Sequence, residues 1–443
     1  QTGGLSVVTR SYDGAEETRQ EKPVSVGPGA TAALKFTVPV KLNGYHDIAA
    51  ALTVGGRPWI EKRSFVRLAP DTRSARWTQG KGAMFGYWSY QGGHHTPKAE
   101  HHIRLMIQAG ARNLVHYFPR GLSDEIQALA AKHWGRGQST AYYVSPQPWA
   151  AEDKPDPAKV EAFKKEIMAN VDKWEKDVPD PFKPDAIHYF AEPHISPRLT
   201  AGNFPEYWNG EPFVYTEEEQ ERLRMFMGTA RLASETYRAA FPDRKLLIPW
   251  GDPGFVVPLL RAGFPTSLVD GCGIDVPNFE RLPEMQLADN AVHRLYELRK
   301  EFEKVGMTNP VLQTCEGAFV PTEPGACTWR EQMDIYSRWA LIDMAYGVNR
   351  FFSGWFAFDC GNYYGAEHYG GCGIQRRIPY ADPKPAYAAF ATLTERLNEA
   401  NFDGWLKTGS LTTFCLRFRH EARGFVYALW TIRGTLPVTL SLN

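Results

Sequence analysis

The sequence lacks an excess of charge of either sign. Lysine and arginine together number 50, aspartate and glutamate together number 50, and the formal net charge is +0. A protein that binds nucleic acid or an anionic membrane surface by electrostatics carries a basic excess. No apolar run approaches the roughly 20 residues that a membrane-spanning helix needs. We therefore expect neither a nucleic-acid partner nor a membrane partner.

The sequence also lacks the short motifs that bind metal ions. Its six cysteines include no Cys-x-x-Cys pair, and no His-Glu-x-x-His pattern occurs. Two histidine doublets are present, His94-His95 and His101-His102. Neighbouring residues of a helix point in different directions, so one ion rarely binds both members of a doublet. We interpret the doublets as a polar rim and a solvated helix start, and we expect no metal and no cofactor.

The start of the sequence has no methionine and no signal-like apolar stretch. The first residue is Gln1, so we expect a mature or trimmed form. Cys360 and Cys372 flank a loop rich in glycine and tyrosine. They form a disulfide if the protein is exported, or they are two reduced thiols, and the sequence leaves both alternatives open.

What the sequence does contain is enough apolar material for a large core. The chain has 443 residues, of which 43% are hydrophobic and 23% are charged. These proportions are those of a globular protein. The length is sufficient for one barrel of about 250 residues and a smaller companion domain.

Both ends of the chain alternate between apolar and polar residues, which predicts half-buried strands. We expect residues 1–76 and 403–443 to form one accessory β-sandwich together. A turn is expected between His420 and Gly424. The expected strands include the stretches Leu34–Val40, Ile48–Val54, Phe414–Phe418, Phe425–Leu429 and Leu436–Leu442.

Between the two ends, strand-like and helix-like segments alternate along the chain. One helix start has Asp156 as N-cap and Pro157 at its first position, and another has Thr216 and Glu219 in capping-box spacing. Eight strand–helix units are typical of a (β/α)₈ TIM barrel of the α/β class, expected over residues 77–402. The expected strands are Ala83–Trp88, Arg112–Tyr117, Thr140–Val144, Ala186–Ala191, Lys245–Trp250, Leu268–Ile274, Val311–Cys315 and Arg350–Phe356.

Two glutamates follow expected strands. Glu192 comes after the fourth strand, in Phe190-Ala191-Glu192-Pro193, and Glu316 comes after the seventh, in Thr314-Cys315-Glu316-Gly317. Barrel enzymes place their chemistry at the carboxyl ends of the strands. Two carboxylates from different strands are the minimum set for cleaving a glycosidic bond.

In these two segments the chain resembles the clan A glycoside hydrolases. That resemblance implies a retaining enzyme in which Glu192 is the acid/base and Glu316 the nucleophile. It spans roughly residues 80 to 400, and the added β-sandwich is similar to the layout of family thirty-nine. Ala191 departs from the pattern, because the family usually has asparagine there to bind the sugar 2-hydroxyl. Another group must contact that hydroxyl, or the preferred sugar presents its C2 differently.

Polar and aromatic residues also end the other strands, as a carbohydrate site requires. His116 or Asp275 is a candidate for orienting Glu316 by a hydrogen bond. The candidate substrate-binding residues are Trp88, His116, Tyr143, Trp250, Asp252, Asp275 and Trp355.

The sequence therefore predicts a glycosidase that acts on an oligosaccharide or polysaccharide. Because polymeric glycans are found outside cells, we expect a secreted or periplasmic protein. Two alternatives stay open, namely a barrel that binds polysaccharide without cleaving it and a metal-dependent barrel hydrolase. An inverting glycosidase is a third, and it would hold its carboxyl groups about 6.5–9.5 Å apart. The sugar, the linkage and the oligomeric state are not specified by the sequence.

Overall fold

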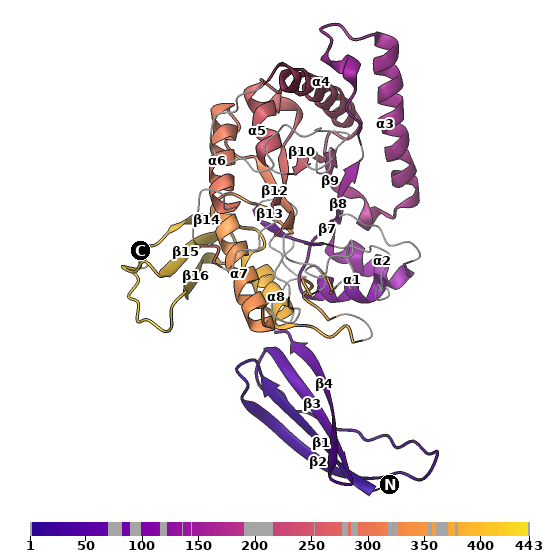
Figure 1. The fold of residues 1–443 in the computed structure, drawn as a ribbon, viewed down its shortest axis with the longest axis vertical. Helices are drawn as coiled ribbons and strands as arrows, with labels where there is room; N and C mark the ends of the chain where they lie inside the picture. Colours follow the sequence, from indigo (N-terminus) through magenta and orange to yellow (C-terminus); the bar gives the residue numbers. More distant parts are fainter. Residues whose placement is uncertain are drawn as a thin grey trace.

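The centre of the molecule is a closed barrel of parallel strands (Figure 1). The strands lie in the order β5-β13-β12-β11-β10-β9-β8-β7-β6. Only Gly86 separates β5 from β6, and β5 pairs with β13 while β6 pairs with β7, so the two edges of the sheet meet. All eight expected barrel strands are confirmed. Their bounds are β5 Met84–Phe85, β6 Tyr87–Trp88, β7 Leu114–Val115, β8 Gln138–Tyr142, β9 Pro184–Tyr189, β10 Lys245–Gly251, β11 Gly271–Val276, β12 Val311–Gly317 and β13 Arg350–Phe351.

The computed structural model describes most of the chain. The residues it describes are 2–69, 82–88, 99–115, 122–134, 136–142, 144–189, 216–251, 253–276, 282–284, 291–317, 322, 327–352, 357–359, 371–376 and 380–441.

Helices follow the strands and surround the barrel (Figure 1). Asp156 accepts a hydrogen bond from the backbone N–H of Ala158 and begins α3, and Thr216 and Glu219 form the capping box of α4, both as expected. In the described part of the chain no helix is long and apolar enough to cross a membrane. The helices are α1 Ala99–Gln108, α2 Asp124–His133, α3 Pro157–Asp177, α4 Glu217–Ala240, α5 Pro253–Arg261, α6 Ala291–Lys304, α7 Trp329–Ala345 and α8 Pro385–Leu397.

The apolar core lies between the barrel wall and these helices. Ile187 and Tyr189 of β9 pack in one cluster with Phe163 of α3 and Phe226 of α4. A second cluster joins β5 to β7 and β11 to β13 with α1, α2 and α5 to α8, and it includes Leu312 of β12. Residues that alternate with these positions therefore face the inside of the barrel.

Both ends of the chain form antiparallel sheets, and these are two separate sheets, so the single β-sandwich expected from the two ends stays a prediction. The N-terminal sheet has the order β2-β1-β3-β4 and the C-terminal sheet the order β14-β15-β16. The turn expected between His420 and Gly424 is confirmed. The strands are β1 Thr2–Ser11, β2 Glu16–Ser25, β3 Gly44–Val54, β4 Arg57–Arg67, β14 Ala400–Trp405, β15 Thr413–His420 and β16 Gly424–Thr431.

Two expected strands are wrong. The stretch Leu34–Val40 and the described part of Leu436–Leu442 have no regular secondary structure. The first stretch is held through side chains, because the Gln20 amide and the Lys22 ammonium of β2 donate to its backbone carbonyls. Alternating apolar residues form a stable strand only where a neighbouring strand satisfies their backbone groups, and no strand of the described residues pairs with them.

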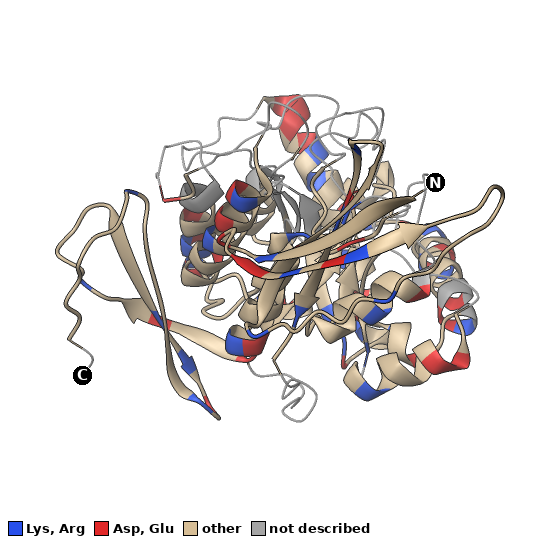
Figure 2. Ribbon diagram, turned by 90° about the horizontal axis from the view of Figure 1, so that it is seen from below, with Lys and Arg blue, Asp and Glu red and all other residues tan. Residues whose placement is uncertain are grey.

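The two end sheets lie against different parts of the barrel's outer layer. The N-terminal sheet extends beyond α8, whereas the C-terminal sheet lies beside α6 and α7 (Figure 1), and the view from below separates them in the same way (Figure 2). Arg63 of β4 contacts the carboxylate of Asp382 through Nε at 2.8 Å and attaches the first sheet to the segment before α8. Ala400, Leu416 and Phe418 of the second sheet join the core around α7 and α8. The domain limits at residues 76/77 and 402/403 stay predictions.

Candidate active site

The barrel brings the ends of β9 and β12 to the same rim. Glu316 is the second-to-last residue of β12, and β9 ends at Tyr189, three residues before Glu192. Because all the barrel strands are parallel, their carboxyl ends share one edge of the barrel. Glu192 lies outside the described residues, so the separation of the two carboxyl groups stays a prediction.

The other predicted site residues divide into two groups. Trp88 is the last residue of β6 and its side chain is 2% exposed. Trp250 and Asp275 are the second-to-last residues of β10 and β11. With Glu316, these positions are at the carboxyl ends of four strands of one barrel. The remaining predicted residues lie outside the described part of the chain, namely His116, Tyr143, Asp252 and Trp355.

The strand that contains Glu316 has one extra residue near its end. Ile274 of β11 pairs with Thr314, but Val276 pairs with Gly317, so two steps on β11 correspond to three on β12. Just before this point the Thr314 hydroxyl accepts a hydrogen bond from the backbone N–H of Phe352 at 3.0 Å. An extra residue interrupts the strict alternation of faces along a strand. Irregularities of this kind are common beside active sites.

Inside the barrel, three polar side chains meet below this rim. Nε2 of His188 lies 2.8 Å from Oγ of Ser139 and 2.9 Å from Nε2 of Gln313. The Gln313 amide also donates to the Ser139 hydroxyl at 2.7 Å. All three residues are 0% exposed. Ser139 and His188 belong to the neighbouring strands β8 and β9, whereas Gln313 of β12 reaches both of them across the interior of the barrel.

An ion pair continues this network toward the other end of the barrel. Nε of Arg350 donates to Oε1 of Gln313 at 2.7 Å, and its two terminal nitrogens donate to the Asp185 carboxylate at 2.8 Å each. The Asn113 amide donates to the same carboxylate at 2.7 Å. Ser139 pairs with Ala186 while Gln138 pairs with Pro184, so Asp185 is an extra residue in β9. Because this extra residue interrupts the alternation of faces along β9, Asp185 can join the polar network.

Reasoning from sequence missed the whole of this network. The residues involved are Asn113, Ser139, Asp185, His188, Gln313 and Arg350. Barrel interiors are usually filled by branched apolar side chains. A signal was available, because His188 and Gln313 interrupt otherwise apolar strands. Their meeting could not be foreseen, because it depends on which face of each strand turns inward.

A second buried ion pair joins Asp359, which follows the last barrel strand, to Lys384, which directly precedes α8. Nζ of Lys384 is 2.6 Å from Oδ1 of Asp359 and also donates to the carbonyl of Gly371 at 2.9 Å. The lysine side chain is 0% exposed and that of the aspartate 13%. Asp359 follows the eighth strand, but this pairing gives it a structural role.

The histidines do not form a metal centre in the part of the chain that is described. No group of three or more His, Cys, Asp or Glu side chains there could hold an ion. His94 and His95 lie outside it. The expected solvated position is wrong for His102, which is 0% exposed and packs against Tyr87 and Phe358. Burial, with the nearby charge of His101, lowers the pKa of His102 to about 3.

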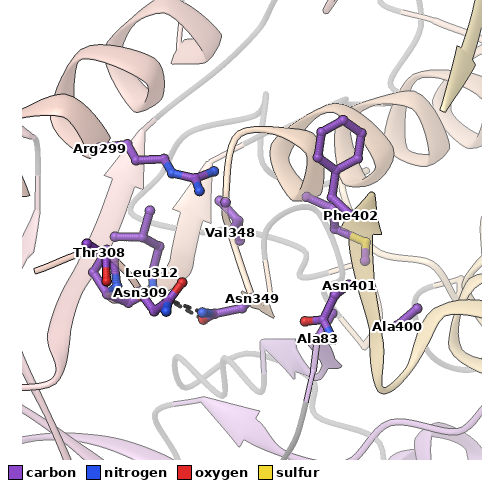
Figure 3. A pocket seen from close by; sticks show the side chains of 13 residues that line it. Ala83, Arg299, Thr308, Asn309, Leu312, Val348, Asn349, Ala400, Asn401 and Phe402 are labelled. Atoms are coloured by element: carbon purple, nitrogen blue, oxygen red, sulfur yellow. Dashed lines mark hydrogen bonds between the residues drawn. The ribbon is translucent and has the colours of Figure 1, made fainter. Parts of the chain in front are cut away.

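A pocket of ≈350 Å³ lies away from the predicted site (Figure 3). Its lining comes from residues that precede β5, β12 and β13 and from β14, so it is at the amino ends of the strands. Arg299, Asn309 and Asn401 supply polar groups, and Phe402 supplies an aromatic ring. Conserved chemistry in this fold is found at the opposite end, and we therefore assign the pocket no part in the candidate site.

The fold is similar to that of solved glycoside hydrolases. No protein-family model matches the chain, and no curated protein matches it in sequence. A family 39 glycoside hydrolase from the gut symbiont Bacteroides cellulosilyticus WH2 superposes with a TM-score of 0.63 at 13% identity, covering 97% of this chain and 84% of that one. A GH30 endoxylanase from Clostridium papyrosolvens C71 has a TM-score of 0.45 at 13% identity, covering 78% of this chain and 80% of that one. The first likeness confirms the predicted fold, a TIM barrel with accessory antiparallel strands, and at this identity it concerns the fold alone.

Proposed function

We propose that the protein is a retaining glycoside hydrolase with Glu192 as acid/base and Glu316 as nucleophile. The observation that carries the proposal is the place of Glu316 at the carboxyl end of β12, three strands along the wall from β9, after which Glu192 follows. The fold shared with the family 39 enzyme supports it. The substrate in this proposal is a carbohydrate, and the protein works outside the cytoplasm, where glycan polymers are found.

The proposed reaction divides the work between two carboxyl groups about 5–5.5 Å apart. In the first step Glu192 donates its proton to the leaving oxygen while ionised Glu316 attacks the anomeric carbon. Water, deprotonated by Glu192, then releases the sugar from Glu316. Two like charges at this separation repel, which favours the protonated form of one group and suits it to act as the acid.

The irregularity in β12 supports the role given to Glu316. Gln313 faces the barrel axis, since it contacts His188 across the interior. Strict alternation would turn every second residue after Gln313 inward and would leave position 316 on the opposite face. The proposed role requires a carboxylate that faces the axis. The extra residue between Thr314 and Gly317 reverses the alternation and is compatible with that requirement.

The decisive experiment replaces each carboxylate and measures turnover of aryl glycosides. We expect Glu316→Gln to abolish hydrolysis of every aryl glycoside that the unaltered protein cleaves. We expect Glu192→Ala to retain part of the activity on dinitrophenyl glycosides, because such leaving groups need little acid assistance. Glu303→Gln is the control, since Glu303 is a half-exposed residue of α6 whose ion pair with Arg299 spans 3.7 Å. Full activity of Glu316→Gln would overturn the proposal.

The same assay separates the alternatives. A barrel that only binds polysaccharide would release no product from any member of a glycan panel. A metal-dependent hydrolase would lose activity in a chelator, whereas the proposed mechanism predicts unchanged activity. Proton NMR of the first product formed distinguishes retention from inversion at the anomeric carbon, and an inverted product would contradict the role of Glu316 as nucleophile.

A further inference from the structure

The contact between Gln313 and His188 joins the two strands of the proposed acid and nucleophile directly. In the barrel wall, β9 and β12 are separated by β10 and β11. Inside the barrel, Nε2 of Gln313 and Nε2 of His188 are 2.9 Å apart, with the Ser139 hydroxyl against both. We propose that Gln313, His188 and Ser139 are positioning residues that set the separation of Glu192 and Glu316. This inference rests on the proposed function.

The contact between Gln313 and His188, called the link below, lies near the ends of β9 and β12, where it can set the separation of the two strands. Gln313 comes three residues before Glu316, and His188 comes four before Glu192. A strand rises about 3.3 Å per residue, so on β12 the link lies roughly 10 Å before Glu316. It therefore lies outside contact with a bound sugar and acts on geometry. A link at this depth fixes the two strands relative to each other just before they reach the rim.

The hydrogen bonds of the network run in one direction. Arg350 can only donate, so the oxygen of the Gln313 side chain must be the atom that faces its Nε at 2.7 Å. The amide nitrogen of Gln313 then faces Ser139 and His188 and donates to them. Nε2 of His188 is accordingly an acceptor, which places the ring proton on Nδ1. Asp185 holds both terminal nitrogens of Arg350, which fixes the orientation of the guanidinium and of the Gln313 amide. The Ser139 hydroxyl has two acceptors, Nε2 of His188 at 2.8 Å and Oε1 of Gln313 at 3.1 Å.

A buried polar network fixes distances more strictly than apolar packing does. Apolar side chains tolerate changes of shape at modest cost, whereas satisfied polar networks fix unique distances and are costly when broken. The retaining and inverting separations differ by only about 1 Å at their nearest limits. A displacement of about 1 Å at a reacting group reduces rates by about 100-fold. Because the rate depends so strongly on the separation of the carboxyl groups, we expect direct contacts to fix it.

The test compares two buried serines that contact neighbouring residues of β9 from opposite sides. Ser139 meets His188 inside the barrel, and Ser234 of α4 meets the hydroxyl of Tyr189 outside it. Both serines are 0% exposed. We expect Ser139→Ala to reduce kcat about 10-fold and Gln313→Met about 100-fold, with KM changed less than about threefold. Ser234→Ala should lower Tm and leave kcat unchanged.

Two readouts distinguish positioning from a purely structural role. The loss of kcat in Gln313→Met should be larger for aryl glycosides with poor leaving groups, since these depend most on a well-placed acid. Crystal structures of the variant and the unaltered protein should differ by about 1 Å in the distance between the Glu192 and Glu316 carboxyl groups. Equal distances, or equal losses for good and poor leaving groups, would overturn the inference.

The outcome is separable from that of the proposed function. Full activity of Glu316→Gln would refute the function, whereas the carboxyl separation in the crystals measures the effect of the link without any need for turnover. If Gln313→Met does not fold, Ser139→Ala decides the question, because it removes a single hydroxyl and leaves Gln313, His188 and Arg350 in place. An unchanged kcat and an unchanged separation in Ser139→Ala would then overturn the inference.

Discussion

The inner and outer faces of the barrel wall are built from different chemistry. On β9, Ile187 and Tyr189 face the helices and pack in an apolar cluster, while Asp185 and His188 face the interior and make polar contacts. The strand β12 repeats the division, with Leu312 outside and Gln313 inside. Apart from Asp185, the extra residue of β9, these residues alternate along the same strands, so the difference arises from orientation and not from position in the chain.

The outer face of the barrel wall mainly stabilises the fold, and the inner face mainly fixes the geometry of the candidate site. The outer face buries apolar area, which stabilises the fold roughly in proportion to that area and does not depend on direction. The inner face buries charges and amides, whose burial is costly unless every partner is in place. A substitution on the outer face should therefore affect mainly unfolding, and a substitution on the inner face should affect both unfolding and catalysis.

The largest effect is expected at the inner ion pair. Arg350→Met removes the charged donor of the Asp185 carboxylate and of Oε1 of Gln313, and leaves the carboxylate only the neutral amide of Asn113. We expect a loss of about 4 kcal/mol in the free energy of unfolding, since removing one partner leaves an uncompensated charge. Urea denaturation measures this loss, and kcat should fall with it because the Gln313 amide loses the donor that fixes its orientation.

A double variant provides the control for this prediction. Adding Asp185→Leu to Arg350→Met removes the second charge as well, and part of the lost stability should return. The kcat should stay low, because neither change restores the donor to Gln313. Recovery of kcat together with stability would contradict the distinction between the two faces.

A smaller effect on unfolding is expected on the outer face. Leu246 of β10 is 0% exposed and packs in the cluster with the helices. Leu246→Ala should cost about 3 kcal/mol, from lost burial and the cavity that remains. Measured well below the lowered Tm, kcat should match that of the unaltered protein. A drop in kcat comparable to that of Gln313→Met would mean that the outer face also sets the geometry of the site.

The fold could be predicted from sequence because its signals are local. Most barrel strands are short apolar runs, and some helix starts have capping residues that the sequence reveals, as at Asp156 and Thr216. Local alternation misled the prediction at Leu34–Val40, where no neighbouring strand completes the sheet. Whether a strand has a partner is a property of the whole fold, and the residues within the stretch do not reveal it.

The candidate site could be predicted only in part, for the same reason. Residues at strand ends, such as Trp88 and Glu316, follow from counting strands. The contact between Ser139 and Gln313 joins residues 174 apart in the chain. It depends on closure of the barrel, on the register of several strands and on the extra residue Asp185 in β9. None of these features leaves a periodic pattern in the sequence.

The smallest expected effect concerns a polar side chain on the outer side of the wall. His102 of α1 packs edge-on to Tyr87 of β6, with ring centroids 6.2 Å apart, and its pKa is lowered to about 3 by burial and by His101. An unfolded histidine has a pKa of about 6.5. Below about pH 6.5 His102 binds a proton in the unfolded chain but not in the folded protein. Its contribution to the free energy of unfolding is therefore complete above about pH 6.5 and is lost as the pH falls toward 3.

Comparison with a variant that cannot titrate isolates this contribution. The unfolding free energy of the unaltered protein should fall by about 2 kcal/mol more than that of His102→Gln between pH 7 and pH 5. Chemical denaturation of both proteins at both pH values measures this difference. The contributions of titratable groups that the two proteins share cancel in it. The kcat should be the same in both proteins at pH 7, since His102 lies outside the barrel interior. Parallel stability curves would mean that His102 binds its proton equally well in the folded and the unfolded protein, and the outer face would then hold a buried charge at pH 5.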